Sequence, residues 1–469
     1  MFTPPQRHSW LWAVLPLGTD TVAVPDDPDL ARAVSEAGLG VAEDLAPVVL
    51  MTLRNGRMPR RAAVEEWLHG AEVVAVSVGG GRTEIRDRVS RPRRALERAA
   101  TPFLAAMSWL TGRRIAEMLR GHGFAVSRLP VSDRSRGPVT VGSSLWKHHV
   151  IPLGVIVVGR MRRRPTVLEA VTSAAADDIG GALAVRRVRT VETGKVLLDV
   201  ADDAGRRYVL RVAGANAAGF LWTSLGSVRS INALSRSPVL KDRLVQPIAH
   251  GAVGPVQYAL EPWTAGAHPR RMTPALWEQC LEFLVELHRL QPGGKGPGRL
   301  VTDIQLLETY ADEAGKRTLN KLRDQLCDRL ADLTLGWGHG DFWQENLLTD
   351  GERLVAVLDW DTATPASLPM LDLMDLIALS RRRDRGLTPG PRLAGVLLPL
   401  IRAGEDTRIR AYCDATGVPP DRRTLEALAL GYWIDRTARD LRDTPDRRVR
   451  PTWIAQNVRA PLSQLASWR

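Results

Sequence analysis

The stretch between residues 336 and 376 constrains this chain more than any other part of it. It contains His-Gly-Asp at 339–341 and an asparagine at 346, five residues after the aspartate. An apolar run at 354–358 follows and leads into Asp-Trp-Asp at 359–361. Short apolar runs bounded by turn residues are typical of buried strands. The segment therefore predicts two strands joined by a tight turn, with acidic and amide side chains gathered near their ends.

These side chains suit phosphoryl transfer, a reaction that needs few protein groups. A carboxylate must orient the attacking hydroxyl and accept its proton, and oxygen ligands must hold Mg²⁺ against the phosphates of ATP. Asp341, in a tight loop, can do the first job. Asn346 and Asp359 can do the second, because Mg²⁺ takes few carboxylates together with phosphate and water. The alternative is that they are loop residues that serve turns.

The pattern HGDxxxxN followed by LDW resembles the aminoglycoside phosphotransferase, choline kinase and homoserine kinase superfamily. The resemblance covers roughly residues 180 to 445. It implies a protein-kinase-like fold, ATP and Mg²⁺ as cofactors, Asp341 as the catalytic base, and Asn346 and Asp359 as metal ligands. By the same likeness His339 braces the catalytic loop.

The resemblance assigns supporting roles to three further aspartates. Asp372 in "MLDLMDL" is similar to the structural aspartate that ties down the catalytic loop, and Asp375 is the less favoured match. Asp361 is expected to lie near the metal without being one of its two ligands.

A small antiparallel sheet precedes this segment in the predicted fold. Strands are expected at 185–191, 195–201, 207–212, 244–253 and 256–263, with a hairpin turn at 202–207 and a helix at 217–234. After residue 272 the pattern is almost entirely helical. The predicted fold class is thus α/β and α+β, in which an N-terminal Rossmann-like domain is followed by a bilobal kinase-like domain.

The nucleotide side of this plan departs from the family pattern. Arg211 stands where the resemblance expects a phosphate-binding lysine, and the two side chains differ in geometry. The segment 213–240 contains no Asp or Glu, so the usual ion pair with the following helix cannot form. Lys195 is a second candidate cation, with a solvent-facing strand position as the alternative. The phosphate-covering loop at 191–195 has a single glycine, Gly194.

Adenine is expected at the segment 259–266, which Glu261 and Trp263 flank by family likeness; for Trp263 a packing role is an equal alternative. The acceptor pocket is expected beside the catalytic loop, under helices between about 395 and 445. Its candidate carboxylates are Asp435 and Asp440. Arginines are interleaved with them, and such charge mixing on a helix is typical of a solvated face. The neighbouring Tyr432 and Trp433 are expected in the core.

The first part of the chain, residues 1–155, alternates short apolar strands with helical patterns, which favours a doubly wound parallel sheet. The stretch GRRIAEMLRGHGFAVSRLPV at 112–131 weakly resembles the late helix–strand unit of Rossmann-like methyltransferases. The turn at 15–21 that would hold a cofactor contains only Gly18, so a structural or partner-binding role is favoured. The predicted domains are 1–155, a linker at 156–182, a small lobe at 183–265 and a helical lobe at 266–469.

Composition excludes several other classes. The net charge of +12 comes from arginines spread along the chain, and no nucleic-acid-binding motif accompanies them. The three cysteines lack the spacing of a disulfide framework or a zinc site, which fits a reducing cytoplasm. The longest apolar stretch, at 151–159, is too short to span a bilayer. No secretory leader is recognisable at the N-terminus.

Together these features predict a cytoplasmic small-molecule kinase that phosphorylates a hydroxyl of a sugar, an amino alcohol or an aminocyclitol. Two alternatives stay open. One is a binding or scaffold protein on a kinase fold without phosphoryl transfer, because of the departures at Arg211 and Gly194. The other is a bifunctional chain with an N-terminal methyltransferase.

Overall fold

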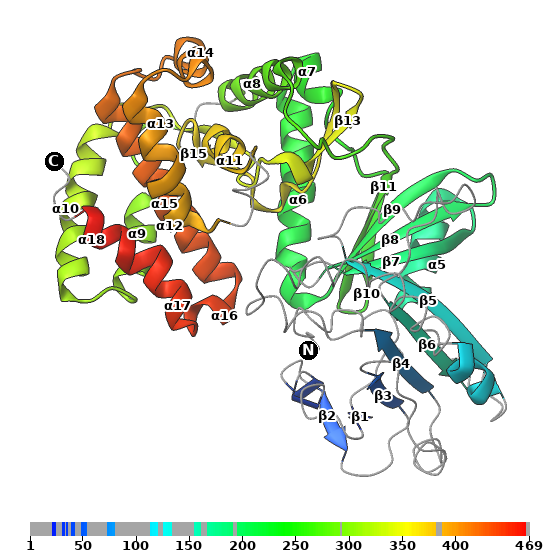
Figure 1. Cartoon of the computed structure of the whole chain (residues 1–469). Helices are drawn as coiled ribbons and strands as arrows, with labels where there is room; N and C mark the ends of the chain where they lie inside the picture. Colours follow the sequence, from blue (N-terminus) through cyan, green and yellow to red (C-terminus); the bar gives the residue numbers. More distant parts are fainter. Residues whose placement is uncertain are drawn as a thin grey trace. The chain divides into compact units, whose positions relative to one another are not determined.

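The computed structural model describes residues 21–24, 31–32, 34–35, 39–42, 48–53, 73–79, 113–120, 125–133, 154–160, 167–190, 195–290, 293–380 and 387–465. The chain forms two compact units. The first comprises Met1–Leu221 with Pro247–Trp263, and the second comprises Trp222–Gln246 with Thr264–Arg469. The boundary falls within helix α6 (Ala215–Leu234), which is coloured green in Figure 1.

The first unit contains the predicted antiparallel strands. They are β7 (Leu183–Thr190), β8 (Lys195–Asp202), β9 (Arg207–Ala213), β10 (Ala249–Val253) and β11 (Val256–Pro262), adjacent in the order β10-β11-β9-β8-β7. The predicted hairpin turn joins β8 to β9, where the Asp202 carboxylate accepts the Arg206 N–H at 2.8 Å. Gly205 at φ +78 supplies the left-handed turn residue. The small antiparallel sheet is therefore confirmed.

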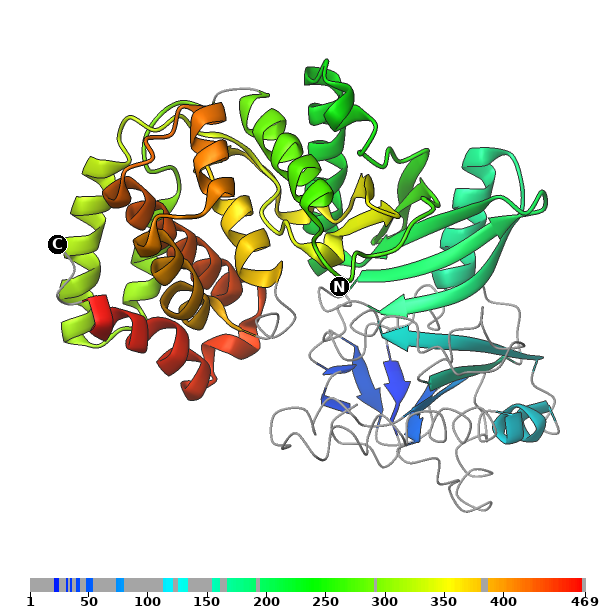
Figure 2. The ribbon, with the colours of Figure 1, turned by 45° about the horizontal axis from the view of Figure 1, so that its top comes forward.

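Helix α5 (Val167–Ile179) packs on one face of these strands and closes a small core. Because side chains alternate along a strand, Val196, Leu198 and Val200 of β8 point into this core with Val171 of α5. The same alternation places Lys195 and Asp199 on the opposite face, and Arg211 lies on that face of β9. Figure 2 shows α5 beside the strands β7 to β9.

The N-terminal strands join the same sheet. They are β1 (Thr21–Ala23), β2 (Gly40–Ala42), β3 (Val48–Leu53), β4 (Val73–Gly79), β5 (Ala125–Asp133) and β6 (Gly154–Arg160). Strands β1 to β4 pair in parallel, as the strand–helix alternation predicted, whereas β6 runs antiparallel between β4 and β5.

Strand β5 then pairs in parallel with β7, at Val131↔Val188, so that the described strands β1 to β11 form one sheet. Apart from Thr21, the turn expected at 15–21 lies outside the described residues. The segment expected as a linker includes the end of β6 and all of α5. The Rossmann-like domain and the domain boundaries stay predictions.

The second unit is mostly helical, as predicted. Its helices are α7 (Pro238–Lys241), α8 (Pro274–Arg289), α9 (Leu300–Glu308), α10 (Glu313–Arg329), α11 (Leu371–Ser380), α12 (Pro389–Arg392), α13 (Leu398–Ala403), α14 (Thr407–Thr416), α15 (Arg422–Asp443), α16 (Pro445–Arg448), α17 (Pro451–Ile454) and α18 (Ala460–Leu465). None of the described helices combines the length and apolarity that a bilayer crossing requires.

Helix α15 is the centre of this unit, and α9, α10, α11, α12 and α13 pack on it (Figure 1). It begins after Asp421, whose carboxylate accepts the Thr424 N–H and so caps the first turn. Tyr432 and Trp433 are completely buried, which confirms their predicted place in the core.

Four short strands and two 3₁₀ turns carry the polar segment. Strand β12 (Gly336–Gly338) pairs with β15 (Thr364–Ser367), and β13 (Leu347–Asp350) forms a hairpin with β14 (Arg353–Val357). The 3₁₀ turns are η3 (Gln344–Asn346) before β13 and η4 (Trp360–Thr362) after β14. The predicted strand pair is thus present, and its open end carries the candidate site.

Candidate active site

The loop at 339–341 is fixed by a carboxylate on helix α11. The Asp372 Oδ2 atom accepts the N–H of His339 at 2.7 Å, and Oδ1 accepts the N–H of Gly340 at 2.8 Å. Asp372 is buried, and hydrogen bonds from backbone N–H groups to a carboxylate are among the stronger ones in proteins. Of the two aspartates considered from the sequence, Asp372 is therefore the one in contact with the loop.

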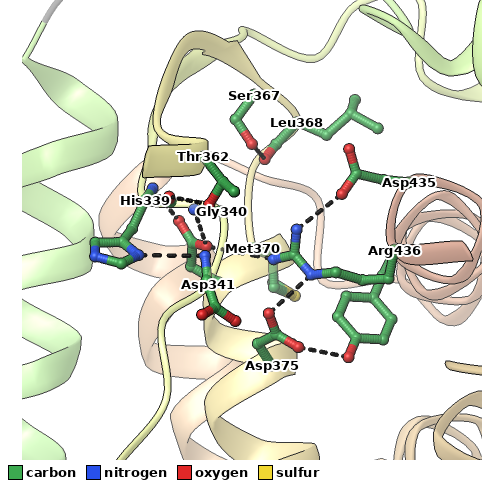
Figure 3. A network of polar contacts seen from close by, with 12 residues as sticks. His339, Gly340, Asp341, Thr362, Ser367, Leu368, Met370, Asp375, Asp435 and Arg436 are labelled. Carbon is green, nitrogen blue, oxygen red and sulfur yellow. Dashed lines mark hydrogen bonds and ion pairs between the residues drawn. The ribbon is translucent and has the colours of Figure 1, made fainter. Parts of the chain in front are cut away.

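The His339 ring connects this loop to the end of β14. Its Nδ1 accepts the N–H of Asp341 at 3.2 Å, and Nε2 lies 2.9 Å from the carbonyl oxygen of Leu358. This pair of contacts fits the neutral tautomer that carries its proton on Nε2. The ring packs against Phe342 and Trp360. His339 thus contacts Asp341, as Figure 3 shows, and also the residue just before Asp359.

Asn346 holds Asp341 directly. Its side-chain NH₂ donates to the Asp341 backbone carbonyl and to the carboxylate Oδ2, both at 2.8 Å. The amide oxygen of Asn346 is the acceptor end of the side chain and can bind a cation. The N–H of Leu358 donates to the carbonyl of Asn346 at 2.8 Å, which brings the residues on either side of the hairpin end together. Asn346 and Asp359 are therefore neighbours across the β13–β14 hairpin.

Asp359 adopts a left-handed backbone conformation, with φ 66 and ψ 62. This conformation is uncommon for residues other than glycine, and such strained positions cluster at functional sites. Asp361, two residues later, is buried in η4. Two residues after the end of β14, Asp359 thus begins the 3₁₀ turn η4 from a left-handed conformation.

The surroundings of Asp341 favour its protonated form. Burial raises the pKa of Asp341, and the nearby carboxylates of Asp375 and Asp359 raise it further, while His339 and Arg436 oppose the change. The side chain still keeps part of its surface accessible. A carboxyl group with a raised pKa is better suited to accept a proton than an ordinary surface aspartate.

A magnesium ion fits the donor types present here. Asp359 offers carboxylate oxygens and Asn346 an amide oxygen, and Mg²⁺ prefers such hard oxygen ligands. Among the described residues no cluster of three or more His, Cys, Asp or Glu side chains could hold a metal by itself. Mg²⁺ commonly completes its ligands with phosphate oxygens and water.

The expected nucleotide-binding cations lie in the first unit. Arg211 Nη1 donates to Glu261 Oε1 at 2.9 Å, and the two side chains are 8% and 14% exposed. Sequence reasoning sought the partner of Arg211 on the following helix and missed the glutamate on β11. Lys195 is buried, so the solvent-facing alternative is wrong. Gly194 lies outside the described residues.

Trp263, at the end of β11, makes a contact of its own. Its backbone N–H donates to the carbonyl of Arg207 at 3.0 Å, and the Arg207 guanidinium lies 3.8 Å above the centre of its ring. This is the geometry of a cation–π interaction. The indole therefore packs under Arg207, while the backbone after it continues into the second unit.

The two candidate carboxylates of α15, Asp435 and Asp440, form ion pairs with arginines. Asp435 pairs with Arg436, Arg439 and Arg299, and Asp440 pairs with Arg447. Burial raises the pKa of Asp435, but the three neighbouring guanidinium groups lower it to about 2. The prediction of a solvated face is therefore wrong for Asp435, because its carboxylate is only 14% exposed and is paired with these arginines.

Comparison with known proteins bears on the region that carries this site. Residues 198–428 match the model of the phosphotransferase enzyme family. No curated protein matches the sequence. Similar solved structures include a macrolide 2'-phosphotransferase type I, with 16% identity and a TM-score of 0.42, covering 65% of this chain and 99% of that one.

Two further solved structures are similar to this chain. Macrolide 2'-phosphotransferase MphH from Brachybacterium faecium has 19% identity and a TM-score of 0.41, covering 62% and 98% of the two chains. A putative fructosamine-3-kinase from Thermobifida fusca has 16% identity and a TM-score of 0.41, covering 63% and 99%. The family match spans the motif at 339–359, from which a resemblance to phosphotransferases was predicted.

Proposed function

We propose that this protein transfers the γ-phosphoryl group of ATP to a hydroxyl of a small molecule, with Asp341 as the catalytic base. The proposal rests on the hydrogen bonds that hold Asp341 itself and the two residues before it. Asn346 donates to its carbonyl and carboxylate oxygens, and Asp372 accepts the two preceding N–H groups. A carboxylate held in this way can orient an attacking hydroxyl, which is the main task of the protein in phosphoryl transfer.

The reaction requires one bond to form and one to break. The hydroxyl oxygen of the acceptor attacks the γ-phosphorus, the bond from that phosphorus to the bridging oxygen of ADP breaks, and the hydroxyl proton passes to Asp341. Since Asn346 occupies Oδ2 of Asp341, the other carboxylate oxygen, Oδ1, is the one that faces the acceptor. The raised pKa of Asp341 supports this role.

The remaining site residues are assigned to the nucleotide and its metal. Asn346 and Asp359 would hold Mg²⁺, which offsets the negative charge of the phosphates. Arg211, positioned by Glu261, takes the place of the phosphate-binding lysine, and Lys195 on the same face is the second cation. By family likeness the backbone around Glu261 and Trp263 meets adenine, and the loop containing Gly194 covers the phosphates.

The acceptor belongs to the hydroxylated metabolites expected from the sequence: sugars, amino alcohols or aminocyclitols. A polycationic acceptor would call for carboxylates that are not already neutralised. Asp435 and Asp440, the two expected to attract such a molecule, are paired with arginines. We therefore favour a sugar-type hydroxyl over an aminocyclitol.

One observation favours a second function, a nucleotide- or ligand-binding protein without phosphoryl transfer. Arg211 replaces the lysine of the family pattern, and an arginine already paired with Glu261 has fewer donors left for phosphate. This alternative and the kinase differ in whether ADP is released in the presence of an acceptor.

The test is ADP release by the purified protein with MgATP and a panel of hydroxylated metabolites. We expect at least one acceptor to support turnover, and Asp341→Asn to lower kcat by about 10³-fold while MgATP still binds. Asp359→Asn should instead weaken MgATP binding. Turnover at the wild-type rate by Asp341→Asn would exclude Asp341 as the base. Nucleotide binding without ADP release for any acceptor would favour the non-catalytic function.

A further inference from the structure

Arg436 is a buried arginine surrounded by carboxylates. Its side chain is 7% exposed, and it pairs through Nε with Asp375 at 2.8 Å, through Nη1 with Asp435 at 2.8 Å and through Nη2 with Asp372 at 3.4 Å. Figure 3 shows the guanidinium reaching from α15 toward Asp375 and Asp435, with Asp341 beside them. Arg436 thus links α15 to two carboxylates of α11.

One of these carboxylates is the group that holds the catalytic loop. The oxygen of Asp372 that meets Arg436 is Oδ1, which also accepts the N–H of Gly340. The other oxygen accepts the N–H of His339. Arg436 is therefore connected to the N–H groups of His339 and Gly340 through one side chain, that of Asp372.

The next arginine on the same face of α15 touches the loop itself. Arg439 Nη1 donates to the carbonyl oxygen of Gly340, and its Nη2 donates to Asp435 at 2.9 Å. Asp435 in turn binds Arg436, so the two arginines are held together by one carboxylate. The loop is thus held by two sets of hydrogen bonds: Asp372 accepts the N–H groups of His339 and Gly340, and Arg439 donates to the carbonyl oxygen of Gly340.

The other partners of this cluster fix Arg436 rather than the loop. Asp375 accepts the hydroxyl of Tyr432 at 2.6 Å and lies 3.5 Å from Arg392. The Arg436 guanidinium also lies 5.4 Å from the centre of the Tyr432 ring. A planar group with all three nitrogens engaged has one orientation, which a lysine could not reproduce.

We propose that Arg436 is a positioning residue of the phosphotransferase: together with Arg439 it ties α15 to the Gly340–Asp341 peptide and so sets the direction of the Asp341 carboxylate. The proposal rests on the proposed function, because this direction matters for turnover only if Asp341 meets an acceptor hydroxyl. The residue acts through Asp372 and the loop, and it touches neither nucleotide nor acceptor in the proposed reaction.

The first arm of the test measures turnover. We expect Arg436→Lys to lower kcat by about 100-fold, because a small misplacement of a catalytic group has effects of that size, and to leave the KM for ATP unchanged. Arg439→Gln, a milder change at a partly exposed side chain, should lower kcat in the same direction. The matched control is Arg402→Gln. Arg402, on α13, forms an ion pair at 3.1 Å with Glu426, which lies on α15 ten residues before Arg436. The kcat of this control should equal that of the wild type.

A second arm separates positioning from stability. Arg436→Met removes the cation that three carboxylates share, although Asp375 keeps Arg392 and Asp435 keeps Arg299 and Arg439. The variant is expected to be less stable, and adding Asp375→Asn removes one of the negative charges. We expect the double variant to regain much of its thermal stability while kcat stays low. Recovery of kcat together with stability would show that Arg436 is only a structural residue.

The third arm does not depend on activity. Amide hydrogen exchange of the peptide that contains His339 and Gly340 should be slow in the wild type and in Arg402→Gln, and faster in Arg436→Lys. Equal exchange in all three would overturn the positioning role even if the enzyme is active. If the wild type releases no ADP with any acceptor, the proposed function fails, and the exchange experiment still decides whether Arg436 orders the loop.

Discussion

The guanidinium of Arg211 on β9 donates to the carboxylate of Glu261 on β11 at 2.9 Å. The two strands are antiparallel neighbours, and Arg211 stands opposite Ala259, so Glu261 is its diagonal neighbour on the same face of the sheet. The cation proposed to contact phosphate is thus oriented by a strand rather than by a helix. A sheet position is fixed by the register of its hydrogen bonds, which gives Arg211 a rigid support.

The first prediction concerns this pair. Glu261→Gln keeps the size of the side chain but removes the negative charge that the buried Arg211 contacts through Nη1, and we expect a loss of about 3 kcal/mol in the free energy of unfolding. The KM for ATP should rise about tenfold, as expected when a binding group loses its fixed geometry. Denaturant unfolding and steady-state kinetics measure the two effects. Arg206→Gln, at an exposed ion pair in the turn between β8 and β9, is the control and should change neither.

The second prediction concerns Gly340, which has φ +84. A Cβ atom added there would lie 2.6 Å from the backbone carbonyl oxygen of Thr362, so Gly340→Ala must displace the loop. We expect kcat to fall by about 100-fold. Gly417→Ala is the control, because Gly417 has a similar φ of +75 and open space around it. The control should lose about 1 kcal/mol of stability and keep its kcat.

The third prediction concerns pH. Burial lowers the pKa of His288 to about 4, with Arg289 acting in the same direction and Asp372 opposing it. The unfolded state therefore binds a proton at His288 more tightly than the folded state does. As a result, the contribution of His288 to the free energy of unfolding is highest above pH 6.5 and decreases as the pH falls toward 4. Between pH 7.5 and 5 the loss from this residue should be about 2 kcal/mol. Urea unfolding of the wild type and of His288→Asn at both pH values isolates the contribution of His288. If the stability of the two proteins depends on pH to the same extent, the prediction is wrong.

The fourth prediction concerns Thr437, next to Arg436 on α15. Its hydroxyl is completely buried and has no hydrogen-bond partner within the described part of the chain. Replacing an unsatisfied buried hydroxyl by a methyl group removes a desolvation cost, so Thr437→Val should stabilise the protein by about 1 kcal/mol. Thr437→Ala should not, because it leaves a cavity. The melting temperatures of the two variants decide the matter, and a lower melting temperature for the valine variant would point to a partner of the hydroxyl.

The parts of the fold predicted from sequence are those encoded locally. The strands β7 to β9 and the turn at Gly205 follow from apolar alternation and turn residues within a few positions. The same holds for the hairpin that follows the loop at 339–341. Spacing along the chain also brought Asn346 next to Asp341, because only five residues separate them.

The relationships that were missed join residues far apart in sequence. Glu261 lies fifty residues from Arg211, and only the pairing of β9 with β11 brings them together. The alternating charges of α15 predicted a solvated face, whereas Arg436 is buried and paired with Asp372 and Asp375. These two partners lie sixty-four and sixty-one residues before it in the sequence. A helical charge pattern does not reveal partners on another helix.

The pairing of β5 with β7 has a consequence for where this protein can be divided. Without β5, the outer side of β7 would present unpaired N–H and C=O groups over Val188–Thr190, and exposed edges of this kind invite association with other chains. A fragment that starts at β7 would therefore be prone to self-association, even with the loop at 339–341 intact. Strand β5, which belongs to the same chain, covers this edge of β7.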